Sequence, residues 1–253
     1  MLRRGACPLA MGALLPYAKP DAPDNGKTRM RCAAIVTACV LGLLAGPALS
    51  EKLSFAMALG ARQIGTLTFD GGPRAGRLLA VMDNTPLGVA DGSFEAVTKA
   101  RGTAVGYESR SRGSKQRDIA VTRAAGQVTE VTVTPADEAT DLSDVAQVPK
   151  GVISLTEAFA ALALGRDCPK PMVVHDGRRV VRIATAARSD SGSEVTCKMS
   201  YRVVQGPGHL SPFRFRTLGM QLTYASAALQ RITLSAGGFD VTLTRQGAKA
   251  ALE

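Results

Sequence analysis

Apolar and polar residues alternate along most of the chain after residue 51. The first such run places Leu53, Phe55, Met57 and Leu59 at every second position. Successive side chains of a strand point to opposite faces, so this pattern predicts half-buried β-strands. Further strand-like runs are found at residues 64–69, 77–82, 94–99, 105–112, 116–123, 127–134, 179–185, 194–204, 212–216, 220–224, 229–235 and 240–245.

Two segments depart from the period of two. Residues 135–150 are acidic, contain few apolar residues and end at Pro149, which predicts an exposed loop or a linker. Residues 154–165 begin with Ser154 and Glu157 at capping-box spacing, continue Ala/Leu-rich and end at Gly165. This second segment therefore predicts one short helix.

Many short strands with one helix favour a mainly β fold. We expect an antiparallel curved sheet that forms a barrel, a half-barrel or a sandwich, with one short helix. Residues 51–253 are enough for a single β-rich domain, and no convincing internal repeat divides them.

The amino-terminal region has the pattern of an export signal. Arg29 and Arg31 precede an apolar run over residues 33–44, and Pro47 and small residues follow. We expect residues 30–50 to be a secretory signal peptide cleaved between Ser50 and Glu51, which places the protein in the periplasm. An uncleaved anchor and a lipoprotein modified at Cys39 are the alternatives, although the apolar run is short for a membrane span.

Residues 1–29 fit poorly in front of such a signal. They contain four prolines and no apolar periodicity, and Met30 stands where a signal peptide would start. We therefore expect residues 1–29 to be a non-native extension, with translation beginning at Met30. A genuine, long positive region is the alternative.

Export changes how the cysteines and the charge are interpreted. Only Cys168 and Cys197 would remain in the mature chain, and an oxidising compartment favours a disulfide between them. A reduced buried pair and a redox site are the alternatives, and no Cys-x-x-Cys spacing supports the latter. The net charge falls from +10 for the full chain to +6, with 25 basic and 19 acidic residues after residue 50.

This moderate positive charge favours anionic surfaces such as lipid headgroups. Aromatic residues make up only 4% of the chain and Trp is absent, which counts against nucleic-acid binding by base stacking. We expect no nucleic-acid partner, and no integral membrane segment after cleavage.

Two basic segments are candidate binding sites. In the turn Asp176-Gly177-Arg178-Arg179, paired guanidinium groups suit a carboxylate or phosphate. The alternative is a plain turn with solvated arginines. Arg110 and Arg112 share one face of a strand in a basic hairpin, which suggests a footprint for anionic lipid; protection of a sheet edge is the alternative.

No catalytic or metal-binding signature is present. His175 and His209 are the only histidines, too few for zinc-site spacing, and there is no Gly-x-Ser-x-Gly motif. A nucleophilic pair of Cys168 and His175 would need a thiol that the expected disulfide consumes. We expect no catalytic residues, no metal and no cofactor.

The stretch from Cys168 to Arg179 resembles a proteobacterial family known as domain of unknown function DUF3108. Tyr107 to Gly113 matches its Tyr-x-Ser-x-x-x-Gly element, residues 155–164 match its helix, and Cys197 falls where a second cysteine often occurs. The resemblance implies export and adds Tyr107 to the candidate site. His175 replaces the family's usual aromatic residue, and the family implies no activity.

Two functions are therefore compatible with the sequence. The first is a non-enzymatic binding or scaffold protein of the cell envelope that holds a lipid, an acyl chain or another apolar ligand, or docks an envelope protein; lipid carriage by related exported half-barrels is an analogy of fold. The second is an envelope hydrolase or transferase whose site follows no recognised motif.

Overall fold

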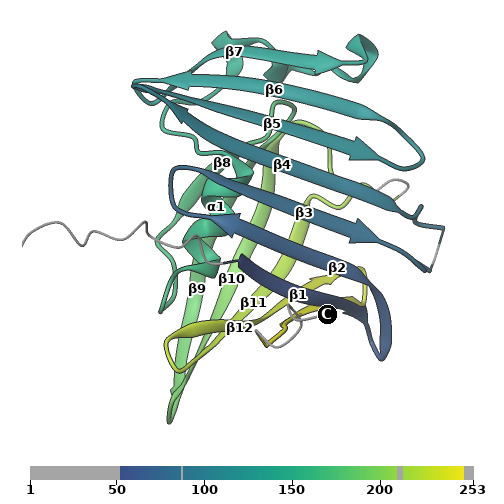
Figure 1. Ribbon diagram of the computed structural model, residues 1–253, viewed down its shortest axis with the longest axis vertical. Helices are drawn as coiled ribbons and strands as arrows, with labels where there is room; N and C mark the ends of the chain where they lie inside the picture. The colour runs from purple at the N-terminus through teal and green to yellow at the C-terminus, as the bar shows by residue number, and fades with distance from the viewer. Residues whose placement is uncertain (1–51, 87, 210–212, 248–253) are drawn as a thin grey trace, which may run out of the picture. The chain divides into compact units, whose positions relative to one another are not determined.

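The computed structural model describes residues 52–86, 88–209 and 213–247 (Figure 1). The expected extension over residues 1–29, the signal over residues 30–50, Cys39 and the cleavage position lie outside these ranges. Within them, no helix is long and apolar enough to cross a membrane.

The described residues form a single antiparallel sheet of thirteen strands, in agreement with the expected mainly β fold. The strands are β1 (Lys52–Leu59), β2 (Arg62–Gly71), β3 (Gly76–Met82), β4 (Gly92–Arg101), β5 (Ala104–Arg112), β6 (Arg117–Ala124), β7 (Gln127–Thr134), β8 (Met172–His175), β9 (Val180–Ser191), β10 (Glu194–Gln205), β11 (Thr217–Ala225), β12 (Ala228–Ala236) and β13 (Phe239–Arg245). Their order in the sheet is β7-β6-β5-β4-β3-β2-β1-β13-β12-β11-β10-β9-β8.

Adjacent strands of the sheet are consecutive in the chain, except for β1 and β13, and the consecutive strands β7 and β8 form its two edges. The pairing of β1 with β13, which sets Phe55 opposite Arg245, joins the β1–β7 meander to the β8–β13 meander. The predicted alternation is confirmed in β1, where Leu53, Phe55 and Met57 are buried and the residues between them are partly exposed. Figure 1 shows the sheet curving so that β1–β7 lie in front of β9–β12.

The one α-helix of the described residues lies inside this curve. Helix α1 (Leu155–Ala163) contacts β3 and β4 on one side and β8 and β12 on the other. The predicted capping box is confirmed, because Ser154 Oγ accepts from the Glu157 backbone N–H and Glu157 Oε2 accepts from that of Ser154. Phe159 packs against Phe55 of β1 and Phe69 of β2, so the helix shares the hydrophobic core with the strands.

The segment between β7 and α1 reaches both edges of the sheet. Most of residues 135–150 are exposed, as the sequence predicts, but the segment is folded against the sheet and is not a free linker. It forms three short 3-10 turns, η1 (Ala136–Glu138), η2 (Asp141–Ser143) and η3 (Val145–Gln147), that contact β7. Ile153 then pairs with the other edge strand, β8, through hydrogen bonds to Val173 and from His175. Glu138 and Leu142 are buried here, so the edges are not left open to other chains.

One strand prediction is wrong. Residues 213–216 of the expected strand over residues 212–216 form no regular strand, and residue 212 lies outside the described ranges. Phe215 makes only an isolated bridge with His209, through two backbone hydrogen bonds of 2.8 Å. Pairing with β10 begins at Thr217, which opens β11, and pairing with β12 begins at Gly219.

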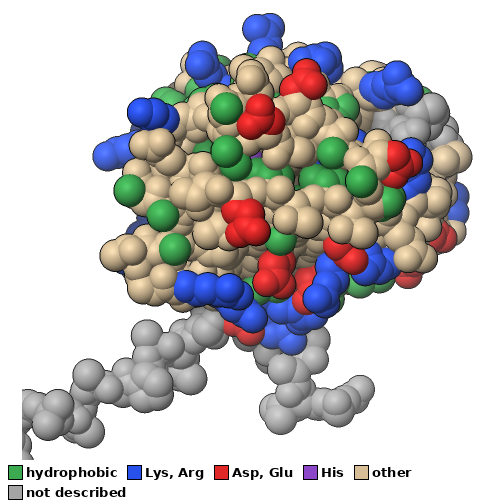
Figure 2. All heavy atoms as spheres, turned by 90° about the horizontal axis from the view of Figure 1, so that it is seen from above, with side chains coloured by type: hydrophobic (Ala, Val, Ile, Leu, Met, Phe, Trp, Pro, Cys, Tyr) green, Lys and Arg blue, Asp and Glu red, His purple; other side chains and the backbone are tan. Residues whose placement is uncertain are grey.

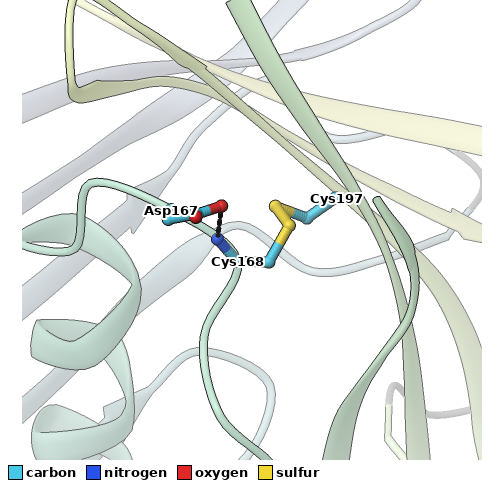
Figure 3. A group of neighbouring side chains, drawn as sticks. All are labelled: Asp167, Cys168 and Cys197. Atoms are coloured by element: carbon cyan, nitrogen blue, oxygen red, sulfur yellow. Dashed lines mark hydrogen bonds between the residues drawn. A yellow bond between two sulfur atoms is a disulfide. The ribbon is translucent and has the colours of Figure 1, made fainter. Parts of the chain in front are cut away.

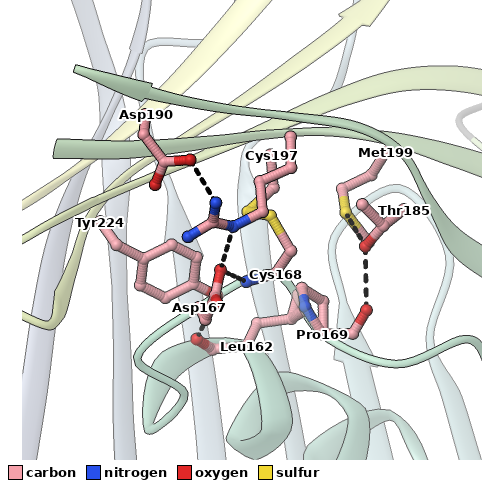
Figure 4. Close-up of a disulfide and its surroundings, with 10 residues drawn as sticks. Leu162, Asp167, Cys168, Pro169, Thr185, Asp190, Cys197, Met199 and Tyr224 are labelled. Carbon is pink, nitrogen blue, oxygen red and sulfur yellow. Dashed lines mark hydrogen bonds and ion pairs between the residues drawn. A yellow bond between two sulfur atoms is a disulfide. The ribbon is translucent and has the colours of Figure 1, made fainter.

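The predicted disulfide is confirmed. Cys168 precedes β8, Cys197 lies in β10, and their sulfur atoms are 2.00 Å apart (Figure 3). Cys197 is fully buried, and the Asp167 carboxylate accepts from the backbone N–H of Cys168. Figure 4 shows the bond beside Tyr224, whose hydroxyl donates to the Leu162 carbonyl at the end of α1. The disulfide therefore fastens the segment after the helix to β10, the third strand from the β8 edge of the sheet.

Candidate functional site

Five of the six predicted ligand-binding residues line one cavity. Its volume is about 440 Å³, within the range of sites that hold small molecules. Its walls come from strands β4–β6, from residues 89–91 and from the turn that joins β8 to β9. The lining residues used below are Met82, Val89, Phe94, Tyr107, Ser109, Ser111, Arg112, Lys115, Arg117, Ile119, Leu155, Asp176, Arg178, Arg179 and His209.

The turn between β8 and β9 is built as the sequence predicts. Asp176 Oδ1 accepts from the backbone N–H groups of Arg178 and Arg179 at 3.0 and 2.9 Å, the local bonding typical of Asp in turns. Gly177 has φ +92°, and a Cβ there would lie 2.4 Å from Ile119 Cγ2. The turn therefore packs directly on β6, which brings both arginines to the cavity.

Arg179 is held from two sides. Its Nε lies 3.0 Å from Asp176 Oδ2, and Nη1 donates to the Gly208 carbonyl and to His209 Nδ1 at 2.8 Å. A guanidinium has only donors, so Nδ1 is the acceptor and the imidazole proton lies on Nε2, 2.6 Å from the Tyr201 hydroxyl oxygen. Burial, and then the charge of Arg179, lower the pKa of His209 to about 4. His209 is thus a neutral link between Arg179 and β10.

Arg178 belongs to a second cluster, around Glu138. The Glu138 carboxylate accepts from Lys115 at 2.7 Å and from Arg117 at 2.6 Å, and it forms an ion pair with Arg178 Nη2 at 2.9 Å. These contacts, with the Lys115 hydrogen bond the largest, lower the pKa of Glu138 to about 2 against the opposing effect of burial. The side chains of Arg178 and Arg179 are only 12% and 10% exposed, so the picture of solvated arginines on a turn does not hold.

Tyr107 contributes a buried hydroxyl to the same cavity. The residue is 3% exposed, and no hydrogen bond of normal geometry reaches its hydroxyl within the described residues. Burial raises its pKa well above the usual range, with Asp176 adding to the increase, while the Ser109 hydroxyl on the same face acts in the opposite direction. A buried hydroxyl without a partner is costly, so it points to a group that completes it.

Arg110 and Arg112 have different surroundings. Arg112 lies at the rim of the cavity and binds Asp118 through both guanidinium Nη atoms, at 2.6 and 3.1 Å. Arg110 is exposed and lines a shallow groove on the outer face of β2–β5 instead. That groove is larger in volume, but two of its charged lining residues, Arg77 and Glu95, already form an ion pair with each other. We therefore place the candidate site in the cavity.

The remaining candidates lie within the fold. His175 is 2% exposed and its Nε2 donates to the Leu142 carbonyl, whereas its buried Nδ1 has no hydrogen-bond partner among the described residues. Cys168 is in the disulfide, so the conceived Cys168–His175 pair has no thiol. Asp167, Cys168 and Cys197 bring their ligand atoms within 4.8 Å of one another, but two of the three are joined as a disulfide and offer no thiolate to a metal.

Sequence reasoning missed the roles of Glu138, Tyr201 and His209. Glu138 stood in a segment interpreted as a loop, and it is 40 residues from its partner Arg178. His209 and Tyr201 come together across the end of β10. No local pattern marks these pairs, because they depend on how distant strands are arranged.

Figure 2 shows one face of the molecule, on which hydrophobic side chains gather near the middle while many Lys and Arg side chains lie toward the margin. The cavity lining has the same two components. Phe94, Ile119 and Leu155 are apolar, whereas Arg178 and Arg179 are charged. A site of this composition suits a ligand that has an apolar part and a polar part.

Comparison with known proteins gives few matches. No family model matches the chain, and no curated protein matches it, so membership of DUF3108 stays a prediction. Among solved structures, the chain is similar to a beta-barrel-like protein of domain of unknown function DUF1849 from Brucella abortus. The TM-score is 0.42 at 11% identity, over 78% of this chain and 96% of that one. Similarity at this level carries no conclusion about function.

Proposed function

We propose that the protein is a non-enzymatic binding protein of the cell envelope that holds a ligand with an apolar part, such as an acyl chain, in the cavity beside β4–β6. The observation that carries this proposal is the composition of the cavity wall. Met82, Phe94, Ile119 and Leu155 offer apolar contact at one cavity, into which buried polar groups are also placed. Small-molecule sites have this pattern of apolar lining with few oriented polar groups.

The surroundings of the nucleophilic and basic side chains favour binding over catalysis. Both ring nitrogens of His209 are engaged, by Arg179 and Tyr201, so the ring has no lone pair to act as a general base. The Cys168 thiol is consumed by the disulfide. A cavity with these groups locked in place suits a ligand that is held and released unchanged.

Export to the periplasm is part of the proposal. Residues 30–50 have the composition of a signal peptide, and a disulfide between Cys168 and Cys197 persists in an oxidising compartment. Cell fractionation followed by amino-terminal sequencing tests this. We expect a periplasmic protein that begins at Glu51. The intact mass of its precursor should be that of a chain that begins at Met30. Recovery of an unprocessed chain from the cytoplasm would contradict export.

The binding proposal is tested with protein purified from the periplasm. Native mass spectrometry and solvent extraction should reveal a bound lipid, and the emptied protein should bind a fluorescent long-chain fatty acid. Ser111→Trp fills the cavity from β5 and should weaken the probe at least about tenfold, a loss of about 1.4 kcal/mol. Arg110→Trp places the same group on the opposite, exposed face of the same strand and should leave binding unchanged. Equal binding by both variants would place the probe outside the cavity.

A further inference from the structure

Positive charge is in excess where the turn meets the cavity. Four cationic side chains, Lys115, Arg117, Arg178 and Arg179, line it there, and two carboxylates are in contact with them, those of Glu138 and Asp176. Lys115 is 72% exposed and is well screened by solvent. The three arginine side chains are only 10–18% exposed, so their charges are screened far less.

The two carboxylates have little capacity left. Asp176 uses Oδ1 for two backbone N–H groups and Oδ2 for Arg179. Glu138 is shared among three cations. Burial and the neighbouring charge of Arg117 lower the pKa of Arg178, with Glu138 and Asp176 acting in the opposite direction. Partly buried charges of one sign are costly unless a counter-charge accompanies them.

A second, independent feature points to the same place. The Tyr107 hydroxyl is buried, lines the cavity and has no hydrogen bond of normal geometry. Asp176 and Arg179 both act electrostatically on it, which places it near the charged end of the cavity. A phenol that has no acceptor of its own is a ready donor to an oxygen atom of a ligand.

We infer that the charged end of the cavity binds an oxyanion, a carboxylate or phosphate group, which accepts a hydrogen bond from Tyr107 and neutralises the excess charge of Arg178 and Arg179. This inference rests on the proposed function and names the polar group of its ligand. The oxyanion is the headgroup of an acyl compound or a free anion, and the two sources differ in whether the apolar wall contributes to affinity.

A series of four ligands separates these sources by calorimetry on the emptied, disulfide-bonded protein. The ligands are dodecanoate, dodecyl phosphate, methyl dodecanoate and inorganic phosphate. We expect the two acyl or alkyl anions to bind at least about tenfold more tightly than the ester, because a charge-assisted hydrogen bond is lost in the ester. We expect inorganic phosphate to bind most weakly, since it leaves the apolar wall uncovered.

Each outcome decides one of the proposals. Equal affinity for ester and acid would overturn the oxyanion inference and leave the proposed function standing. Binding of inorganic phosphate as tight as that of dodecyl phosphate would support the oxyanion site and overturn the acyl ligand. Failure of all four ligands to bind would overturn both.

Tyr107→Phe tests the hydroxyl alone. We expect dodecanoate to bind roughly 3–10-fold more weakly and methyl dodecanoate to bind as before. The melting temperature of the ligand-free variant should not fall, because the removed hydroxyl has no partner in the empty cavity. Tyr224→Phe is the matched control: its hydroxyl donates to Leu162 in the core, so it should lower the melting temperature and keep the preference for the acid. Unchanged affinity of Tyr107→Phe for dodecanoate would overturn the role of the hydroxyl.

Arg178→Met tests the charge. Methionine keeps a long apolar stem beside β6 but has no charge. We therefore expect the tenfold preference for dodecanoate over its ester to shrink several-fold, and the affinity for dodecanoate to depend less on salt concentration. An unaltered preference, in a variant that unfolds cooperatively, would show that Arg178 has no part in binding.

Discussion

Arg179 Nη1 donates a hydrogen bond of 2.8 Å to His209 Nδ1, and this bond requires the imidazole to be neutral. The same ring offers its Nε2 proton to Tyr201, 2.6 Å away, so the turn after β8 is tied to β10 through a single histidine. Protonation of His209 would set two positive charges against each other inside the fold. The state of this residue therefore links stability to pH.

The pH dependence follows from the lowered pKa of His209, which is about 4 in the folded protein and 6.5 when unfolded. Between these values the unfolded chain binds the extra proton, so stability falls as the pH decreases from about 6.5 to about 4 and is regained above that window. We expect a loss on the order of 2–3 kcal/mol from this residue. Urea unfolding at pH 7, 5.5 and 4.5 measures it.

His209→Gln is the control, because an amide can still accept from Arg179 and does not titrate. The variant should lose most of the dependence between pH 6.5 and 4. His175, whose pKa burial also lowers, and Glu138, whose pKa is lowered to about 2, contribute to what remains. Parallel pH profiles for the two proteins would contradict the assignment.

Glu138→Gln should destabilise the protein strongly. The variant removes the carboxylate shared by Arg117 and Arg178, which are 18% and 12% exposed, and leaves both charges without it. Breaking a buried ion pair from one side costs about 3 kcal/mol. Chemical unfolding checks this against Asp137→Asn, an exposed neighbour in the same 3-10 turn that should change stability by less than about 0.5 kcal/mol. Similar losses for both would show that Glu138 is not an anchor.

Gly177→Ala should cost more than the same change at another turn. A Cβ at Gly177 would lie 2.4 Å from Ile119 Cγ2 at φ +92°, so strain and overpacking add. Gly192, in the β9–β10 turn, has φ +60° and open space, so Gly192→Ala carries the backbone cost alone, about 1 kcal/mol. We expect Gly177→Ala to lose at least about 1 kcal/mol more, and to weaken ligand binding because Ile119 lines the cavity.

Removal of the disulfide should lower stability without abolishing the fold. The bond links residues separated by 29 positions, for which the chain-entropy account gives about 3.6 kcal/mol. Cys168→Ala/Cys197→Ala should show this loss in urea, and treatment of the native protein with a reductant should reproduce it. The reductant should not change the stability of the double variant. A loss of stability there would show that the reductant acts on something other than the disulfide.

Much of the fold follows from patterns a few residues long. The alternation in Leu53, Phe55 and Met57 reports a strand with one buried face, because the strand repeats every two residues. The Ser154–Glu157 capping box reports a helix start, because both partners lie within one turn. In these elements the conformation and its stabilising contacts are local, so the sequence contains the whole signal.

The candidate site could be predicted only in part, because many of its contacts join residues that are far apart in the sequence. The sequence alone identified the Asp176–Arg179 turn and the pairing of Cys168 with Cys197 as the favoured disulfide. The tertiary structure decided that the turn packs on Ile119, that Glu138 meets Arg178 from 40 positions away, and that Arg110 faces away from the cavity. It also removed the expected strand over residues 212–216, since a strand needs a paired neighbour and only Phe215 finds a bridge there. Local sequence sets which faces are apolar, whereas the register and curvature of the whole sheet set which side chains meet.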